Sequence, residues 1–420
     1  MITFFPTPYP DEILYSVFAR YHAKSPNING SETARDLFSV NRIVCTLEFP
    51  ALLERLVKNM PLNNPYDVDL LIDNHTLFPY YTVFLDEKDK DYIKRYMALR
   101  KGEIYYKIAG ILNPLGENSH LRFCEKCNEK SMAKYGELYW HRIHQIRGIY
   151  ICPIHGTPIY NSSVSLEDNK YRYIAATKEN CLVTDIKNYE SSLCDKLLII
   201  AKDMAWILNN PVINTKIKEQ YRNQLKILKY ATANGALRQK DLIGDFEAFW
   251  GIEILEKTHS TITKTNNCNW LLEMGWNRKI VTDTLKNILF LRFLGLTPYK
   301  LFNEKIEFLP FGKGKYPCLN PVCPKYKKEI IESIKVKENY KTKSPIGYFT
   351  CPVCGFSYLR RGPDNGQEDR LRYSRIIDYG GYWMDRLIKL SKDHNGAEIA
   401  RIMGTTHTTV YDYLRKIGKK

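Results

Sequence analysis

The feature that most constrains this chain is a set of four short turns that carry seven of its cysteines. The first two turns hold Cys124 with Cys127 and, after 24 intervening residues, Cys152 with His155. Two side chains separated by two residues can point at one spot from a tight turn, and two such turns supply the four ligands of a tetrahedral zinc site. Four protein ligands leave no open position for water. The spacing therefore predicts a structural zinc site made of Cys124, Cys127, Cys152 and His155.

The other two turns predict a four-cysteine zinc ribbon. Cys318 and Cys323 are separated by four residues, and Cys351 and Cys354 follow after 27 intervening residues. Gly355, directly after the last cysteine, permits the left-handed backbone that such a turn requires. Residues 312–343 around the ribbon hold nine Lys and three Glu. This segment either contacts phosphates or is a solvated loop without a ligand, and the sequence gives the two interpretations equal weight.

The compartment decides whether paired cysteines bind metal or form disulfides. Residues 1–9 contain no Lys or Arg and run into closely spaced prolines, so they lack the charged and apolar regions of a signal peptide. We therefore expect a cytoplasmic protein in a reducing environment, where paired cysteines read as metal ligands. The four remaining cysteines have no partner at metal spacing and are predicted to be small buried apolar residues: Cys45, Cys181, Cys194 and Cys268.

Two further histidines, His141 and His144, lie between the two turns of the first zinc site. They could extend that site or compete for it. An ordinary hydrogen-bonded or buried histidine is the favoured interpretation for each.

The charge balance points to a polyanionic partner. The 420 residues carry 62 Lys and Arg against 46 Asp and Glu, a formal net charge of +16, which favours nucleic acid or an anionic surface. The chain is longer than one core usually grows, so several domains are expected. No run approaches the roughly 18 apolar residues of a spanning helix, and the most apolar window, residues 288–296, is interrupted by Arg292. A membrane is therefore not an expected partner.

The helical patterns are long and lie mainly outside the zinc regions. Residues 11–21 and 31–38 predict two N-terminal helices, with Asp11 and Ser31 as N-caps. These two helices could be a small DNA-binding module, although pattern alone favours a helical packing layer. A central helical region is predicted from three further patterns: residues 197–208, 241–255 and 280–294.

The last fifty residues predict a helix-turn-helix. Three helices are expected over residues 382–393, 396–403 and 407–417, with small Ala400 and the turn at Gly404 permitting close crossing of the last two. A plain three-helix domain is the alternative, but the basic tail over residues 415–420 beside the third helix favours DNA binding. The residues predicted to face outward, available to bases and phosphates, are Thr406, His407, Thr408, Tyr411, Asp412, Arg415 and Lys416.

Short catalytic motifs are missing from the sequence. It contains no Gly-x4-Gly-Lys-Ser/Thr phosphate loop, no His-Glu-x2-His helix and no Gly-x-Ser-x-Gly elbow. Nothing in it nominates a carboxylate set for two-metal DNA cleavage. The sequence therefore favours a binding protein with no catalytic residues over a zinc-dependent nuclease or hydrolase.

Four stretches together resemble the TniQ/TnsD proteins, which choose the insertion site of transposons that carry a separate transposase and AAA+ regulator. The first zinc motif resembles the broad TniQ group, while the second, with the C-terminal helix-turn-helix, resembles its TnsD branch. The stretches are Pro-x-Pro-x-Pro-Asp-Glu-Ile-Leu-Tyr-Ser-Val-Phe-Ala-Arg (residues 6–20), Arg-Phe-Cys-x2-Cys to Cys-Pro-x-His-Gly (122–156), Leu-Phe-Leu-Arg-Phe-Leu-Gly (289–295) and Pro-Cys-x-Asn-Pro-x-Cys to Thr-Cys (317–351).

The resemblance implies a bacterial, nucleoid-associated target selector of a TnsABC-type transposon. Such a protein binds double-stranded DNA at the attachment site and recruits the TnsC-like AAA+ ATPase, with transposase subunits or a CRISPR effector complex as further candidate partners. A TniQ-type adaptor that docks on a CRISPR RNA-guided complex and reads little DNA itself is a second hypothesis. A zinc-containing transcription regulator is a third.

These observations predict a mostly α, multidomain chain with two Zn²⁺ ions. Its expected divisions are an N-terminal helical or helix-turn-helix TniQ region (residues 1–120), a zinc finger (121–165), a central helical domain (166–310), a zinc ribbon (311–366) and a C-terminal helix-turn-helix (367–420).

Overall fold

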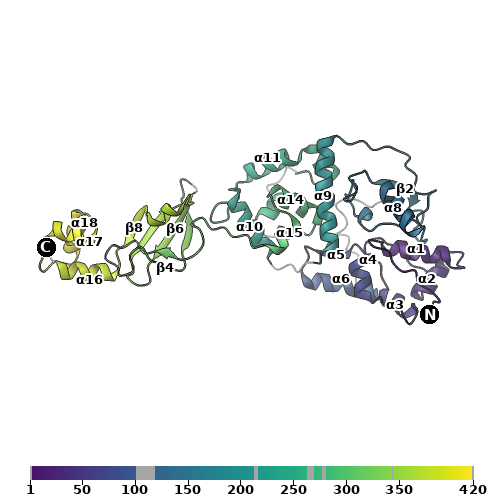
Figure 1. The fold of residues 1–420 in the computed structure, drawn as a ribbon, viewed down its shortest axis with the longest axis horizontal. Coiled ribbons are helices and arrows are strands. Elements are labelled where there is room, and N and C mark those ends of the chain that lie inside the picture. Colours follow the sequence, from purple (N-terminus) through teal and green to yellow (C-terminus); the bar gives the residue numbers. More distant parts are fainter. Residues whose placement is uncertain are drawn as a thin grey trace. The chain divides into compact units, whose positions relative to one another are not determined.

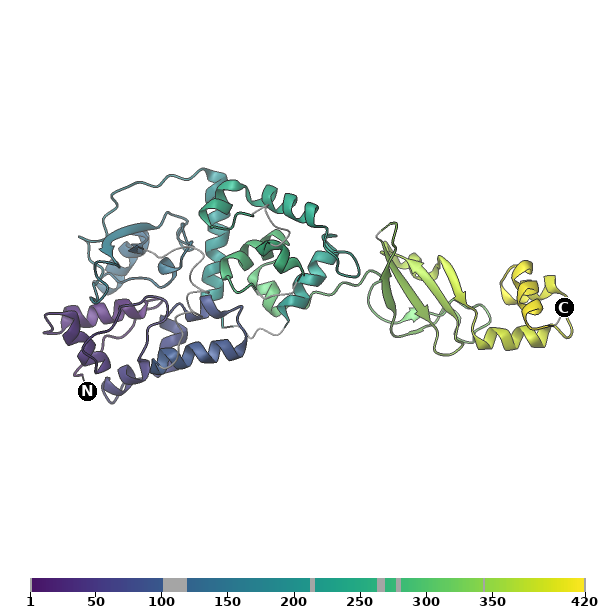
Figure 2. The same ribbon diagram turned by 180° about the vertical axis from the view of Figure 1, so that it is seen from behind.

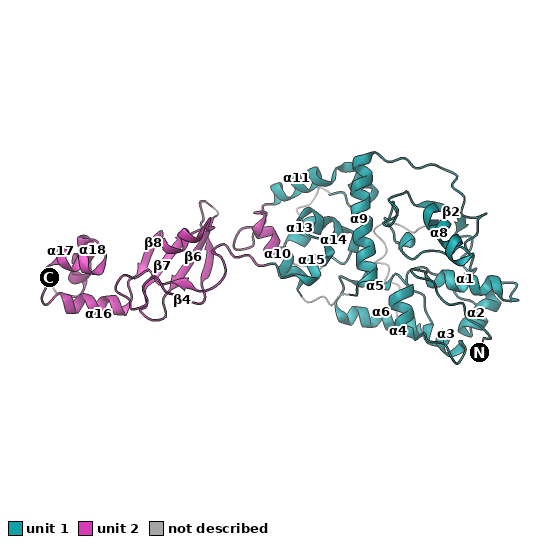
Figure 3. Cartoon of the chain, in the orientation of Figure 1, with its two compact units in different colours: residues 1–221, 239–306 teal, residues 222–238, 307–420 magenta. Residues whose placement is uncertain are grey.

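The computed structural model of the chain describes residues 2–100, 119–211, 216–262, 269–276, 281–342 and 344–418. The chain forms two compact units: Met1–Tyr221 with Gln239–Ile306, and Arg222–Arg238 with Glu307–Lys420 (Figure 3). Helices predominate and the strands form small sheets (Figure 1), which confirms the predicted mostly α, multidomain class. Within the described ranges, no helix combines the length and the apolar character needed to cross a membrane.

The first unit begins with a helical region. α1 is buried over residues 14–21, and Phe18 on α1 packs edge to face on Phe38 of α2, with ring centroids 5.3 Å apart. Burial along most of a helix is expected of a core element, which supports the packing-layer interpretation. The described helices of this region are α1 (Leu14–Lys24), α2 (Gly30–Phe38), α3 (Leu53–Asn59), α4 (Val68–His75), α5 (Phe78–Thr82) and α6 (Glu87–Leu99).

The two predicted N-caps in this region are wrong. α1 begins at Leu14 rather than after Asp11, because the Asp11 carboxylate is used in tertiary contacts, accepting a hydrogen bond from the Ile143 amide at 3.3 Å. α2 begins at Gly30, and its cap is the Asn29 side chain, which accepts from the Ser31 amide at 3.0 Å. Asparagine is as good a cap as serine, so composition alone does not choose between neighbours.

The first cysteine region packs directly on α1. Its elements are β1 (His120–Phe123), α8 (Glu125–Tyr135), η2 (Ile143–Gln145) and β2 (Tyr160–Ser165), with β1 antiparallel to β2. Arg20 of α1 pairs with Glu12 at 2.8 Å and reaches across to Glu137, just after α8, at 2.7 Å. The side chains of Arg20 and Glu12 are both buried, so this network fixes the cysteine region against the N-terminal helices.

Central helices complete the first unit, except that α10 runs from it into the second unit, which begins at Arg222. The pattern predicted as one helix over residues 241–255 is two helices, α11 and α12, because Gly251 adopts a positive φ of 79° between them. The predicted helix at 280–294 is α14, which Asp283 caps; residue 280 lies outside the described residues. Arg292 of α14 pairs with the buried Asp203 of α9, with one N–O distance of 2.6 Å. The helices are α9 (Ser191–Asn209), α10 (Ile217–Ile227), α11 (Gln239–Trp250), α12 (Ile252–Lys257), α13 (Trp270–Trp276), α14 (Thr284–Phe293) and α15 (Pro298–Asn303).

The second unit contains the second cysteine region, built on antiparallel strands. The pair β3–β4 accompanies a four-stranded sheet of order β5-β6-β7-β8 (Figure 2). Phe349 of β6 stacks on Tyr358 of β7 with ring centroids 4.9 Å apart. The buried Arg360 guanidinium packs over the Phe349 ring and pairs with Asp364 at 2.9 Å. The elements are β3 (Tyr316–Pro317), β4 (Glu329–Ile331), β5 (Lys335–Glu338), β6 (Pro345–Thr350), β7 (Ser357–Arg361), η3 (Gln367–Leu371) and β8 (Arg375–Asp378).

The chain then forms three short helices, α16 (Gly381–Leu390), α17 (Gly396–Met403) and α18 (His407–Lys416). Gly404 ends α17 in the left-handed conformation at φ 63°, and the Thr406 hydroxyl caps α18 by accepting from the Thr409 amide at 3.2 Å. A Cβ on Gly396 would lie 2.7 Å from the Tyr411 ring, so this glycine lets α17 and α18 approach. Around a small core (Trp383, Leu387, Ile399, Ala400, Met403, Val410 and Leu414), the helices pack as the pattern predicted.

Candidate metal centres and candidate DNA-binding helix

Both cysteine clusters are built on the same backbone turn. The Gly156 amide donates to the Cys152 carbonyl at 2.9 Å, and the Gly355 amide donates to the Cys351 carbonyl at 3.0 Å. The two glycines have φ values of 66° and 74°, which residues with a side chain rarely adopt. The turn puts two side chains at equivalent positions in the two clusters: His155 and Cys354.

The first cluster gathers three sulfurs around an imidazole nitrogen. Nδ1 of His155 lies 3.6, 3.3 and 3.6 Å from the Sγ atoms of Cys124, Cys127 and Cys152. The sulfurs of Cys127 and Cys152 are 3.7 Å apart. A zinc tetrahedron with ordinary bond lengths has edges of about 3.8 Å between sulfurs and about 3.5 Å between sulfur and nitrogen. These four donors therefore fit one tetrahedral ion.

The three thiols of the first cluster share hydrogen bonds, which raise the pKa of Cys127 and of Cys152 and leave Cys124 as the thiol that ionises first. The pKa of the Cys124 thiol lies well below its ordinary value because Cys127 and Cys152 hydrogen-bond to its sulfur, more than offsetting the effect of burial. The Thr157 hydroxyl adds a contact to the Cys124 sulfur at 3.3 Å. A thiolate is the form that binds metal, so the cluster could hold a metal ion.

His144 lies beside the same sulfurs. Its ligand atom falls in a group with Cys124, Cys127 and Cys152 whose members are all within 4.8 Å of one another. The side chain is fully buried, and burial lowers the pKa of His144 to about 3, so the ring is neutral. His144 is thus buried, as the favoured interpretation expected, and its ligand atom also lies near the three sulfurs.

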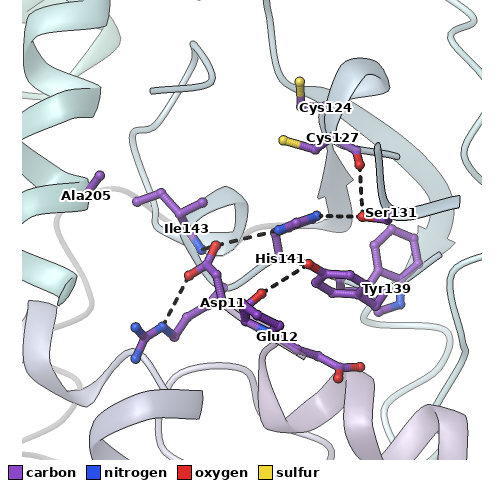
Figure 4. Close-up of polar contacts among 12 residues, drawn as sticks. Asp11, Glu12, Cys124, Cys127, Ser131, Tyr139, His141, Ile143 and Ala205 are labelled. Carbon is purple, nitrogen blue, oxygen red and sulfur yellow. Dashed lines mark hydrogen bonds and ion pairs between the residues drawn. The ribbon is translucent and has the colours of Figure 1, made fainter. Parts of the chain in front are cut away.

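His141, in contrast, is an ordinary hydrogen-bonded histidine. Its ring lies between Asp11 and Ser131 (Figure 4): Nδ1 is 3.7 Å from the Asp11 carboxylate, and Nε2 is 3.3 Å from the Ser131 hydroxyl. Burial raises the pKa of Asp11, but the hydrogen bond from His141 and the charge of Arg142 outweigh it, so the pKa lies below its ordinary value.

This Asp-His-Ser arrangement resembles a catalytic triad only in its residue types. The Ser131 hydroxyl is buried and donates to the Cys127 carbonyl at 2.9 Å, one turn earlier in α8. A nucleophile must be open to its substrate and oriented by its base. Ser131 meets neither condition. The hydrogen bonds of Ser131 instead link His141 to the backbone of Cys127, a residue of the first cluster.

The second cluster gathers four cysteines. Their sulfurs all lie within 4.8 Å of one another, with Cys318 and Cys354 at 3.6 Å, and all four side chains are buried. They form one core with the Phe349 and Tyr358 rings. The cluster could hold a metal ion with four sulfur ligands, so its residues fit the predicted ribbon site.

The sequence did not predict a role for Asn320, which contacts a ligand of this cluster. Asn320 is fully buried; its amide nitrogen contacts the Cys354 sulfur at 3.6 Å and its carbonyl oxygen accepts from the Val322 amide at 3.2 Å. The only signal for it in the sequence is its place between Cys318 and Cys323.

Replacing Asn320 with alanine is expected to speed metal release from the second cluster by roughly tenfold, because groups that orient metal ligands contribute about ten- to a hundredfold in affinity. The rate at which metal passes to a coloured chelator measures the effect. The variants are made in a Cys124→Ser background, which disables the first cluster, so that the signal reports the second cluster. The matched control is the half-buried Asn339, whose side chain accepts only from the amides of its own turn. Equal release from Asn320→Ala and Asn339→Ala would contradict the prediction.

α18 presents most of the residues predicted to contact DNA. Thr406, His407, Thr408, Asp412, Arg415 and Lys416 are exposed, while Val410 and Leu414 face the core. Tyr411 is half-buried, because its ring lies 4.4 Å from the His407 ring and covers Gly396. The described lysines of the ribbon segment, between Lys325 and Lys341, are likewise exposed. Lys343, Lys419 and Lys420 lie outside the described residues.

The remaining cysteines differ from one another. Cys45 is buried as predicted, and burial raises the pKa of its thiol to about 12. Cys181 and Cys194 are only half-buried, so full burial is wrong for them, and Cys268 lies outside the described residues.

Comparisons with known proteins agree with this architecture. The sequence profile of the family described as Tn7-like transposition protein D matches residues 200–420, more than half of the chain, and that of the TniQ family matches residues 3–159. The chain is also 23% identical over 273 residues to the transposon Tn7 transposition protein TnsD of Escherichia coli, covering 64% of this chain and 53% of that protein. It thus spans about half the length of this relative. The chain belongs to the TnsD family of Tn7-like transposition proteins, with a TniQ region at its N-terminal side.

Proposed function

We propose that this protein is a non-enzymatic target selector of a TnsABC-type transposon. It binds double-stranded DNA at the attachment site and recruits a TnsC-like AAA+ ATPase that directs insertion. The observation that carries the proposal is the match of the TnsD family over residues 200–420, which include the exposed face of α18. The name of the relative from Escherichia coli, a transposition protein, agrees with it.

The proposed DNA contacts lie on α18 and its basic end. A recognition helix enters the major groove with side chains that reach base edges, while neighbouring cations contact phosphates. Thr406, His407 and Thr408 stand in the first turn, where a recognition helix meets the bases. Tyr411, Arg415 and Lys416 continue the same outward surface, the last two adding positive charge.

Two Zn²⁺ ions complete the proposal. Cys124, Cys127, Cys152 and His155 hold one, and Cys318, Cys323, Cys351 and Cys354 hold the other. Each ion supplies cross-links between distant chain segments in place of a larger core. Because protein side chains take all four positions, neither ion retains a position for water, which supports a structural role over a hydrolytic one. The five predicted divisions of the chain remain our proposal for its domains.

Selection of bound duplexes from a genomic pool tests the proposal. One duplex is expected to bind far better than scrambled competitors, with affinity that falls steeply as salt rises. Arg415→Ala should weaken binding to all duplexes and lower the salt slope by about 1, since a cation that contacts phosphate contributes without regard to sequence. Arg386→Ala removes the same charge from an exposed position on α16 and is the matched control.

The outcomes separate the alternatives. Equal binding to random DNA at physiological salt would contradict sequence-directed target selection. No preferred duplex, together with co-purification with an RNA-guided CRISPR complex, would point to the adaptor hypothesis instead. Metal-dependent DNA cleavage by the pure protein would overturn the non-enzymatic assignment.

A further inference from the structure

The first metal cluster contains one more donor than a tetrahedral ion can use. Besides its three sulfurs it holds two imidazoles, those of His155 and His144. The His144 ring is fully buried, yet neither of its nitrogens has a hydrogen-bond partner within the part of the chain that the structure describes. Buried polar side chains are nearly always paired, so an imidazole in this state calls for a ligand that the protein alone does not supply.

The neighbouring histidine shows that this environment can satisfy an imidazole. His141 stands three residues earlier, and its ring lies 4.9 Å from the ring of His144. His141 has a partner at each nitrogen, Asp11 and Ser131. His144 has no hydrogen-bond partner among the described residues, and its ligand atom lies within 4.8 Å of the three sulfurs. The difference points to a role for His144 at the metal.

The two candidate imidazoles come from different surroundings. His155 is half-buried on a surface turn, next to Ile154, whose side chain is 65% exposed. His144 belongs to η2, where Ile143 and Gln145 are buried with it. The donor that fits the tetrahedron is therefore the one nearer to solvent, and the spare donor sits inside the core.

We infer that His144 is a reserve ligand of the first centre, which takes the fourth position when His155 leaves it. The centre then keeps a thiolate- and imidazole-binding divalent ion such as Zn²⁺ while its surface turn moves or is contacted by a partner. This inference rests on the proposed metal occupancy of the cluster.

Metal retention in histidine variants of the full chain tests the inference. His155→Ala is expected to keep two ions per chain, and its cobalt-substituted form should retain absorption typical of three sulfurs and one nitrogen. The double variant His155→Ala/His144→Ala should release the first ion to a chelator at least about tenfold faster than His155→Ala. If His155→Ala alone releases it as fast as the double variant, His144 is not a ligand.

The matched control is His155→Ala/His141→Ala, which removes the partnered neighbour and is expected to release the ion no faster than His155→Ala. Circular dichroism checks that each variant folds. In addition, ¹⁵N-histidine spectra of His155→Ala should show a His144 nitrogen shift when Zn²⁺ is added, and an unchanged shift overturns the inference. A wild-type chain that binds only one ion would overturn the metal proposal itself. A wild-type chain that binds two ions, together with variants in which His144 changes neither the nitrogen shift nor the rate of metal release, would overturn only the reserve-ligand assignment.

Discussion

Replacing Cys351 with serine is expected to unfold the four-stranded sheet of the second unit and to lower the bound zinc from two ions per chain to one. The four cysteines belong to the same buried core as Phe349 and Tyr358, so the ligands and the sheet form together. Zinc binding contributes about 10–16 kcal/mol in small zinc-held units, as much as the whole stability of an ordinary domain. Elemental analysis gives the metal content, and amide exchange in β6 and β7 reports the loss of structure.

The control for this change is Cys194→Ser. Cys194 is half-buried on α9 in the first unit and belongs to neither cluster, so two ions and full protection are expected. Two retained ions with protected β6 amides in Cys351→Ser would show that the sheet does not depend on this centre.

Replacing Arg20 with alanine is expected to lower the free energy of unfolding of the first unit by about 3–5 kcal/mol, the usual effect of removing one partner of a buried ion pair. The Glu12 side chain is fully buried and pairs with Arg20 at 2.8 Å. Burial raises the pKa of Glu12, and Arg20 opposes the rise, so the variant leaves this carboxylate without its main stabilising charge. Chemical denaturation followed by amide exchange in α1 measures the loss.

Lys24→Ala is the matched control for Arg20. Lys24 contacts the same Glu137 at 3.0 Å, but its side chain is 50% exposed, so its removal should change stability by only about 0–1 kcal/mol. Equal losses in the two variants would contradict the prediction that the buried ion pair contributes more than the exposed one.

Glu137 adds a pH dependence to the same network. Burial alone would raise the pKa of Glu137, but hydrogen bonds from Tyr9, Arg20 and Lys24 bring it down to about 2. The contribution of Glu137 is therefore complete above its ordinary value near 4.5 and is lost as the pH falls through about 2.

The equivalence of His155 and Cys354 explains how two centres of different composition arise from one local design. Each follows a Cys-Pro-x tripeptide and precedes a glycine with positive φ. The turn aims the fourth residue at the cluster whichever ligand it carries. A sequence search for this turn would therefore find both halves of the metal framework, even where histidine replaces cysteine.

The sequence by itself determined the features that depend on local spacing. Cys318, Cys323, Cys351 and Cys354 converge as their intervals required, and Gly404 ends α17 where its backbone preference places it. Such features need only a few neighbouring residues to act, because turns, caps and the helical period are local properties.

Several side chains look equivalent in the sequence, and only the tertiary structure decided which contacts each of them makes. His141 and His144 look alike in the sequence, yet one is hydrogen-bonded and the other faces the sulfurs. Asp11 looks like a helix cap in the sequence. Its carboxylate instead contacts Arg142 and Ile143, which lie 131 and 132 positions further along the chain. The pairing of Arg20 with Glu137 likewise joins residues 117 apart. These choices follow from the packing of segments that are far apart in the chain. Burial, rather than residue type, sets how strongly a charged side chain interacts with its partner and whether a polar side chain requires a hydrogen bond or a ligand.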